Sequence, residues 1–524
     1  MASTATVDPP APEQRTPYVK NVIWGWIGTA LNLFTGFFLS PYVIHKLGAS
    51  GYGIWVLLFS VVGYYGLLEL GVRSALVRYS AWFHARGEFD KLNELINTVI
   101  GYYTTVMSVV LLIAIVLSRY ADRIFQVPPE YQHDFRLLLI VIGFSAIVGI
   151  NVFAATLEGL QAFDIGTRVY ILTIGIRSIG TFLLLYLGYG LVALGLNVIF
   201  AQIVGYIGAY RGFKRIFPQL KLSIGMMKIS MLRHIASYSV HTFLATMATQ
   251  MLNQTPALLI GFFRPTAYIG YYSFPLRMVQ YALDFVMRVG HVSASRAAEL
   301  SARGLMREVR TLAEYSNRYC LTVFLPLSIF LLPYGRPLIA VWVGAEFAQY
   351  SAPIVPIVLL SVTTAYVAQF NSSSILFGMG KHHRYSHGLL VEAALNVTGM
   401  LLLIPRYGIQ GAAWAAAIPM ILVRGIFTPY LVARYVGANI LAYMRSIFLA
   451  PALTAAPVIA LAYYLRDTLL PGRNWWQLIA AGGAIAASYW LLALFTSIAP
   501  EHRARIFGTA RNLIRRTAGV SARA

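Results

Sequence analysis

The sequence predicts an all-α, polytopic membrane protein, and three observations lead to that prediction. Of its 524 residues, 58% are hydrophobic and 11% are charged, whereas a soluble globular chain carries about 25% charged residues. Apolar stretches of about 20 residues, long enough to cross roughly 30 Å of hydrocarbon, recur along the whole chain. The 41 Lys and Arg residues outnumber the 19 Asp and Glu residues and concentrate in alternate connections. A soluble enzyme with a single membrane anchor is therefore excluded.

The first twenty residues predict a disordered cytoplasmic tail (residues 1–20). Met1–Thr16 contains three prolines, two acidic residues and one arginine. This stretch lacks the basic start and short apolar core of a signal peptide. We therefore expect the first apolar stretch to remain in the protein as a membrane helix.

About fourteen transmembrane helices are predicted along the rest of the chain. They cover Val22–Ile44, Tyr52–Val72, Leu95–Leu117, Phe135–Leu157, Val169–Leu187, Leu191–Tyr210, Ile235–Phe262, Tyr268–Val289, Tyr319–Val341, Pro353–Phe377, Gly388–Ile404, Ile409–Val432, Ile447–Leu465 and Trp475–Ile498. The seventh is the most polar, because it contains His241, Gln250, Asn253, Gln254 and Pro256.

The distribution of basic residues tests this number of spans, because cytoplasmic loops carry an excess of Lys and Arg. With the N-terminus inside, 29 basic residues fall in inside segments and eight in outside segments. The remaining four lie within spans: Arg136, Arg177, Arg277 and Arg424. The pattern predicts that both termini are cytoplasmic. Most of the formal charge of +22 is thus explained by topology and gives no reason to infer binding to nucleic acid.

An internal repeat is visible when the chain is compared with itself. A shift of 219 residues aligns Leu157, Gly159 and Gly180 with Leu376, Gly378 and Gly399, and a shift of 216 aligns Gly51–Ile54 with Ala267–Gly270. Six spans repeated once give parallel repeats, related by an axis along the membrane normal. We expect two six-helix lobes, residues 21–215 and 235–435, joined by a basic cytoplasmic linker at 216–234. Two additional helices (436–499) and a basic cytoplasmic tail (500–524) follow.

Charged residues inside spans are candidates for function, because insertion of an ion costs at least about 2.5–3.5 kcal/mol. In the eighth span, Arg277, Tyr281, Asp284, Arg288 and His291 share one helical face. The seventh span has a matching stripe of Thr242, Thr246, Thr249, Asn253 and Pro256. Two consecutive polar stripes predict a water-filled interior that both helices line. Arginine suits phosphate oxygens, so Arg277 and Arg177 are candidate anion-binding residues.

Simpler structural roles compete with these interpretations. Arg288 and His291 fit a snorkelling helix end, Asp284 fits a pair with Arg288 or with a neighbouring helix, and Glu69 fits a pair with Arg73. Glu392 has no basic residue nearby in its own helix, and together with Asp284 it is a candidate for binding a proton or sodium ion. His382, His383 and His387 lie in a short basic loop without a carboxylate or cysteine, so we expect contact with anionic lipid rather than a metal.

The motifs that define common catalytic sites are absent from the sequence. It contains no P-loop, HExxH, GxSxG or zinc-ligand spacing, and its single cysteine, Cys320, excludes an internal disulfide. We therefore expect a protein without a cofactor, without a metal site and without enzymatic activity.

Four segments carry a resemblance to a known family. Leu47–Trp55, Leu70–Arg78, Leu157–Phe163 and Tyr268–Tyr272 resemble the polysaccharide transporters, the O-antigen flippase-like branch of the multidrug/oligosaccharidyl-lipid/polysaccharide exporter superfamily. The resemblance implies a V-shaped bundle of two six-helix lobes that alternates between inward-open and outward-open states. It also implies transport of an undecaprenyl-diphosphate-linked oligosaccharide to the outer leaflet, commonly driven by an ion gradient or the membrane potential.

The resemblance further implies that cavity arginines hold the diphosphate. Arg277 is the position that best matches that role, and Arg177 and Arg73 are weaker matches. The first span contains no arginine, unlike that of lipid II flippases, which counts against a peptidoglycan precursor as substrate.

The leading prediction is a flippase of the bacterial inner membrane that serves O-antigen, exopolysaccharide or capsule synthesis. Its expected partners are the lipid-linked oligosaccharide, membrane lipids and a polysaccharide polymerase, with no nucleic acid. One alternative is an ion-coupled multidrug exporter of the same superfamily, which fits poorly with arginines at mid-membrane. Another is a membrane-embedded glycosyltransferase or ligase, which would need a sizeable outside loop or an acidic metal–nucleotide motif, and neither is visible.

Overall fold

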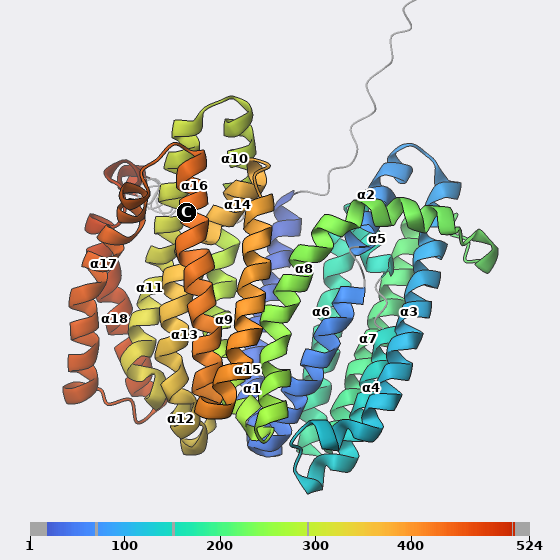
Figure 1. The fold of residues 1–524 in the computed structure, drawn as a ribbon, viewed down its shortest axis with the longest axis horizontal. Helices are drawn as coiled ribbons and strands as arrows, with labels where there is room; N and C mark the ends of the chain where they lie inside the picture. The colour runs from blue at the N-terminus through green and yellow to red at the C-terminus, as the bar shows by residue number, and fades with distance from the viewer. Residues whose placement is uncertain (1–17, 69–71, 149–151, 291–292, 506, 509–524) are drawn as a thin grey trace, which may run out of the picture. The chain divides into compact units, whose positions relative to one another are not determined.

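The computed structural model describes residues 18–68, 72–148, 152–290, 293–505 and 507–508. Within these ranges the regular secondary structure is entirely helical, which confirms the predicted all-α class (Figure 1). The first half contains α1 (Tyr18–Leu68), α2 (Val72–Ala85), α3 (Phe89–Ile124), η1 (Pro129–Tyr131), α4 (Gln132–Val148), α5 (Val152–Gly159), α6 (Phe163–Tyr186), α7 (Leu191–Ile216) and η2 (Ile224–Met226).

The second half continues with α8 to α18, interrupted by short 3-10 and π-helical segments. These are α8 (Ile229–Phe263), α9 (Ala267–Gly290), α10 (Ser293–Ala302), α11 (Met306–Val343), α12 (Ala345–Ser351), η3 (Ala352–Ile354), α13 (Val355–Ser361), η4 (Val362–Val367), α14 (Phe370–Gly378), α15 (His383–Met420), η5 (Ile421–Phe427), α16 (Thr428–Tyr435), α17 (Ile440–Tyr464), η6 (Leu465–Leu469) and α18 (Trp475–Thr496).

Two predicted connections between spans are reduced to a single glycine. Gly48 has φ +69° and breaks α1 between the first and second predicted spans. Gly408 has φ +58° and breaks α15 between the eleventh and twelfth. Both values lie in the left-handed region that glycine adopts without the steric penalty of a Cβ atom. A one-residue break therefore separates the two helical segments at each of these points.

The chain is a multi-pass membrane protein. Ten helical segments of the described chain are long and apolar enough to cross a membrane. One of them, His383–Tyr435, contains the break at Gly408, and another, Phe34–Tyr64, contains the break at Gly48. The polar-striped helices α8 and α9 are not among the ten. Each of the fourteen predicted spans overlaps helix in the described part of the chain, but their exact number stays a prediction.

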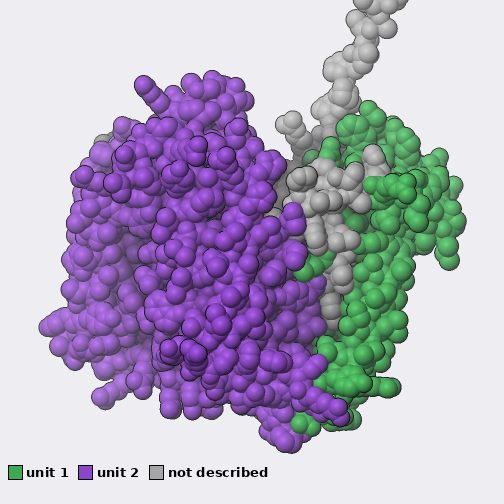
Figure 2. All heavy atoms as spheres, viewed as in Figure 1, with its two compact units in different colours: residues 1–47, 65–121, 132–243 green, residues 48–64, 122–131, 244–524 purple. Residues whose placement is uncertain are grey.

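The chain forms two compact units, which Figure 2 shows in different colours. Unit 1 contains residues 1–47, 65–121 and 132–243, and unit 2 contains residues 48–64, 122–131 and 244–524. Residues 48–64, which follow the break at Gly48, thus group with unit 2. The predicted domain boundaries stay predictions.

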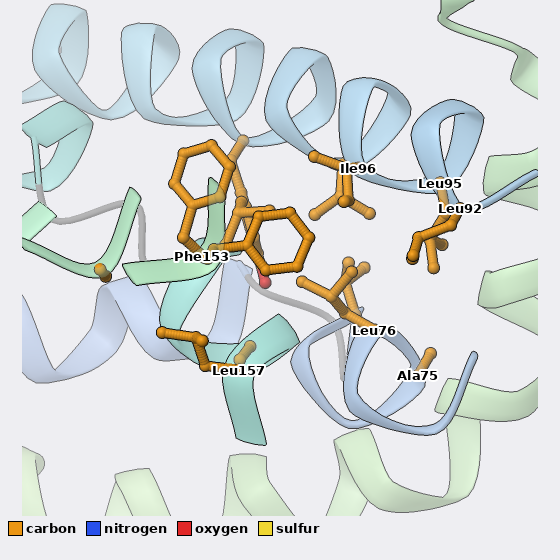
Figure 3. Packing of buried hydrophobic residues seen from close by; sticks show 14 of the residues in the cluster. Ala75, Leu76, Leu92, Leu95, Ile96, Phe153 and Leu157 are labelled. Atoms are coloured by element: carbon orange, nitrogen blue, oxygen red, sulfur yellow. The ribbon is translucent and has the colours of Figure 1, made fainter. Parts of the chain in front are cut away.

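The core of unit 1 includes a cluster where α2, α3 and α5 meet (Figure 3). The side chains of Leu76, Ile96 and Phe153 point toward one another there, and each is at most 1% exposed. Close packing is what holds membrane helices together, because lipid tails are as apolar as these side chains. The cluster therefore fixes the short helix α5 against α2.

Close approaches at glycines recur in both units, as the predicted repeat requires. In unit 1, a Cβ atom on Gly159 of α5 would overlap the carbonyl oxygen of Val77 in α2. In unit 2, a Cβ on Gly378 of α14 would overlap the carbonyl oxygen of Ala294 in α10 in the same way. Gly159 and Gly378 are one of the pairs aligned by the 219-residue shift. The same packing of two short helices thus occurs once in each half of the chain.

The segment that joins α7 to α8 is held along α3 by hydrogen bonds to its backbone. Asn93 Oδ1 accepts from the Lys221 amide at 2.9 Å, and Asn97 Oδ1 accepts from the Ser223 amide at 2.8 Å. Asn97 Nδ2 also donates to the Lys221 carbonyl at 2.7 Å. The predicted basic linker is therefore docked on unit 1 over these residues.

Candidate functional site

Arg277, the strongest candidate from the sequence, lies at mid-length on α9 with an exposed side chain. Its guanidinium lies near the hydroxyl of Tyr52, in the second half of α1, and the two groups interact electrostatically. Tyr52 is only 4% exposed, so it supports Arg277 from the protein interior. Arg277 therefore has a buried tyrosine beside it and a side chain that remains accessible.

Two glycines allow the helices that carry these residues to approach closely. A Cβ on Gly270 of α9 would lie 3.1 Å from the Ala49 carbonyl oxygen and 3.2 Å from Cδ1 of Tyr52. A Cβ on Gly53 of α1 would overlap the carbonyl oxygen of Thr266. These glycines belong to the two segments aligned by the 216-residue shift. The repeat motif thus positions Tyr52 against the helix that carries Arg277.

Asp284 lies two turns after Arg277 on α9 and is half-buried. Its Oδ1 accepts a hydrogen bond from Nε2 of Gln280 at 2.7 Å. Tyr281, between them on the same face, is also half-buried. The side chain of Arg288 and the whole of His291 lie outside the described part of the structure. The alternative that Asp284 pairs with Arg288 therefore stays a prediction.

The polar stripe on α8 is present over the residues whose side chains are described. Thr246 is half-buried, and Thr249 and Asn253 are exposed. The side chain of Thr242 lies outside the described part. The stripe therefore offers hydroxyl and amide groups along nearly two turns of the helix.

The structure adds a polar contact that sequence reasoning missed. The Tyr64 hydroxyl, from the second half of α1, forms a short hydrogen bond with the Thr255 hydroxyl of α8. On α8 itself, Nε2 of Gln254 donates to Oε1 of Gln250 at 3.3 Å. The sequence offered one indication of this contact. The amide residues of the seventh span lower its hydropathy, and amides in a membrane helix often face other polar groups.

Glu392, the second candidate for ion binding, is fully buried on α15 and forms an ion pair. Nε of Arg424 lies 3.0 Å from Oε1 and 2.9 Å from Oε2 of Glu392. The Arg424 guanidinium also lies over the ring of Tyr366, 5.1 Å from its centroid. Sequence reasoning missed this pair because it looked for a basic residue only within the same helix, and Arg424 lies 32 residues further on.

The two residues that accompany Glu392, the cation Arg424 and the aromatic Tyr366, both lie in π-helical segments. Arg424 lies in η5 and Tyr366 in η4. Single π-helical turns widen a helix locally and often occur at functional sites. Here the wider turns bring a cation and a ring beside a fully buried carboxylate.

The other two candidate arginines lie in unit 1. Nη2 of Arg73 on α2 contacts Oε2 of Glu158 on α5 at 2.7 Å, and the two side chains are 50% and 41% exposed. The expected partner, Glu69, lies outside the described residues. The side chain of Arg177 on α6 is exposed, and its main-chain carbonyl accepts a hydrogen bond from Asn197 at 2.9 Å. Arg73 is thus engaged by an acid from a neighbouring helix.

Comparison with known proteins identifies the family of the chain and a membrane protein related to it. Residues 47–352 match the family described as "Polysaccharide biosynthesis protein". The membrane protein EpsK of Bacillus subtilis strain 168 is 23% identical over 493 residues, which cover 90% of this chain and 94% of EpsK.

Solved structures of transporters share the fold. A structure of the lipid II flippase MurJ in an inward closed conformation has a TM-score of 0.70 at 14% identity, covering 91% of this chain and 98% of that one. An inward-facing multidrug resistance MATE family transporter of the MOP superfamily has a TM-score of 0.64 at 12% identity, covering 79% and 98%. The chain therefore has the fold of MOP superfamily transporters and belongs to the polysaccharide biosynthesis protein family.

Proposed function

We propose that the protein is a flippase that moves a polyprenyl-diphosphate-linked oligosaccharide from the cytoplasmic to the outer leaflet by alternating access. The observation that carries the proposal is Arg277, an exposed cation at mid-length on a polar-faced helix of a transporter fold. Membership of a polysaccharide biosynthesis family supports a saccharide cargo. The proposed setting is the bacterial inner membrane, with both termini in the cytoplasm and a polysaccharide polymerase as a downstream partner.

Arg277 is the proposed anchor for the diphosphate. Its guanidinium offers a planar fork of N–H donors that matches phosphate oxygens, and such charge-assisted bonds are about twice as strong as neutral ones. Tyr52, behind it, limits the number of rotamers that the side chain must lose on binding. Arg177 is a second proposed anchor. Arg73 ranks below both, because a phosphate there would compete with Glu158 for the same guanidinium.

The polar face of α8 is the proposed path of the sugars. Thr246, Thr249 and Asn253, with Tyr281 of α9, offer donors and acceptors for hydroxyl groups. Gln250 and Gln254 extend the same helix face with amides. A hydrated oligosaccharide can exchange its hydrogen bonds with water for these groups, while the isoprenoid tail stays in lipid.

Asp284 is the proposed coupling residue in preference to Glu392. A bound proton or sodium ion biases a conformational equilibrium only when it binds one state more tightly. Asp284 accepts a hydrogen bond from a neutral amide, so its charge is open to neutralisation by a cation. Glu392 is already neutralised by Arg424, so a cation there would have to displace a guanidinium.

An ion-coupled multidrug exporter is the alternative of the same superfamily, favoured by the fold shared with a MATE family transporter. Exporters of organic cations need an acidic or aromatic site, whereas the accessible charge at mid-length on α9 is basic. The anionic diphosphate therefore fits the polar face of α9 better than an organic cation does.

Complementation of a flippase-deficient strain tests the proposal. We expect Arg277→Gln to abolish surface polysaccharide and Arg277→Lys to restore part of it, because lysine keeps the charge without the fork. Arg307→Gln, an exposed arginine near the start of α11, is the matched control and should complement fully. Full complementation by Arg277→Gln at normal protein level would show that no diphosphate is held at this position.

A further inference from the structure

A surface cavity of about 410 Å³ lies in unit 2, and none of its lining residues belongs to α8 or α9. Arg318 of α11 forms part of its wall. The other lining residues are all on α17: Ala442, Arg445, Ser446, Leu449, Ala450 and Leu453. Their spacing of three and four residues places them on one face of the helix. At 1.5 Å per residue, this stripe is about 16 Å long.

The stripe is polar at one end and apolar at the other. Arg445 and Ser446 lie near the start of α17, and Arg318 joins them from α11. Leu449 and Leu453, one and two turns further on, are 43% and 64% exposed. The charge count assigns the start of α17 to the cytoplasmic side of the membrane. The lining therefore matches an amphiphilic ligand, because its cationic groups lie at the predicted membrane surface and its apolar side chains lie deeper.

The guanidinium of Arg318 lacks an acceptor among the residues that the structure describes. Its Nε atom is buried and makes no hydrogen bond there. Glu314, one turn earlier on α11, pairs instead with Arg310 at 2.7 Å. Across the described chain, neither Arg318 nor Arg445 has a carboxylate within 4.0 Å. A buried donor of a charged group is costly when left unpaired, so an anion from outside the chain would complete this site.

We propose that this cavity binds an anionic phospholipid of the cytoplasmic leaflet. The lipid phosphate would accept hydrogen bonds from Arg318 and Arg445, and one acyl chain would lie along Leu449 and Leu453. Basic pockets between transmembrane helices on the cytoplasmic side are suited to anionic head groups, and that leaflet is rich in them. The cavity holds a phosphate and part of one chain but is small for a diphosphate with its sugars. The site stands independently of the flippase proposal.

Native mass spectrometry of the full-length protein, released from detergent with added phosphatidylglycerol, tests this site. We expect one tightly bound phosphatidylglycerol on the wild type and binding weakened at least about tenfold in Arg318→Gln/Arg445→Gln, because two charged hydrogen-bond donors are lost. Ala442→Phe should weaken binding as well, because its ring fills the cavity while both arginines remain. Ala442 is exposed, so this variant tests occupancy without disturbing the core.

Three comparisons decide the outcome. Arg307→Gln, an exposed arginine that is not part of the cavity lining, should bind phosphatidylglycerol like the wild type. Equal retention of phosphatidylcholine, or unchanged retention in both cavity variants, would overturn the proposal. Displacement of phosphatidylglycerol by equimolar undecaprenyl phosphate would instead assign the cavity to a polyprenyl phosphate and overturn the phospholipid assignment. None of these readouts depends on whether Arg277→Gln transports.

Discussion

Breaking the buried ion pair between Glu392 and Arg424 should destabilise unit 2 strongly. Glu392→Gln removes the carboxylate and leaves the guanidinium, whose side chain is only 16% exposed, without its counter-ion. Removing one partner of a buried pair costs about 3–5 kcal/mol, because the remaining charge is still desolvated. Both carboxylate oxygens contact Nε of Arg424, so the variant also loses charge-assisted hydrogen bonds. The ring of Tyr366 provides only partial compensation.

The assay is thermal unfolding of the purified protein in detergent, with Arg384→Gln as the control for loss of one exposed charge. We expect Glu392→Gln to lower Tm by roughly 6–20 °C, because a loss of about 3–5 kcal/mol shifts Tm by about 2–4 °C per kcal/mol in a domain of about 150–250 residues. Glu392→Gln/Arg424→Gln should recover much of this loss, because no lone charge remains. An unchanged Tm in Glu392→Gln, together with lost transport, would refute this reasoning and restore Glu392 as the ion-binding residue.

Two further predictions concern packing and the linker. Gly159→Ala and Gly378→Ala should each lower Tm more than Gly483→Ala does. A Cβ would overlap a backbone carbonyl at the first two positions and meets nothing within 4 Å at the third. If only one of the first two variants lowers Tm, the repeated contact is not equivalent in the two units. Asn97→Leu should speed limited proteolysis between residues 219 and 228, because three hydrogen bonds between Asn97 and this segment are lost. An unchanged cleavage rate would mean that Asn97 does not hold the linker.

The helical class, the membrane character and the repeat were predictable from sequence because each rests on local information. Hydropathy over about 20 residues identifies a span regardless of its neighbours. Gly159 and Gly378 were aligned by sequence alone, and their equivalent backbone contacts confirm that the alignment has a structural basis. The breaks at Gly48 and Gly408 were harder to locate from the sequence. Each break is a single residue in the left-handed region, so there is no extended polar loop to recognise.

The partners of the charged residues were not predictable in the same way. Arg73 pairs with Glu158, and Glu392 pairs with Arg424, in both cases across two different helices. A single sequence records which side chains share a helical face but not which helix packs against that face. Asn97 illustrates the same limit, because an amide in an apolar helix gives no sign that its partner is the backbone of a linker more than 120 residues away.

The most direct test of the central proposal is transbilayer movement of a lipid-linked oligosaccharide by purified protein in vesicles. The cargo is loaded on one leaflet, and its arrival on the other is followed with a membrane-impermeant sugar-modifying reagent. We expect wild type and Arg307→Gln to move the cargo at equal rates, and Arg277→Gln to be slower by about 10- to 150-fold, the equivalent of about 1.5–3 kcal/mol for a charged hydrogen bond. Movement at the wild-type rate by Arg277→Gln would contradict the account.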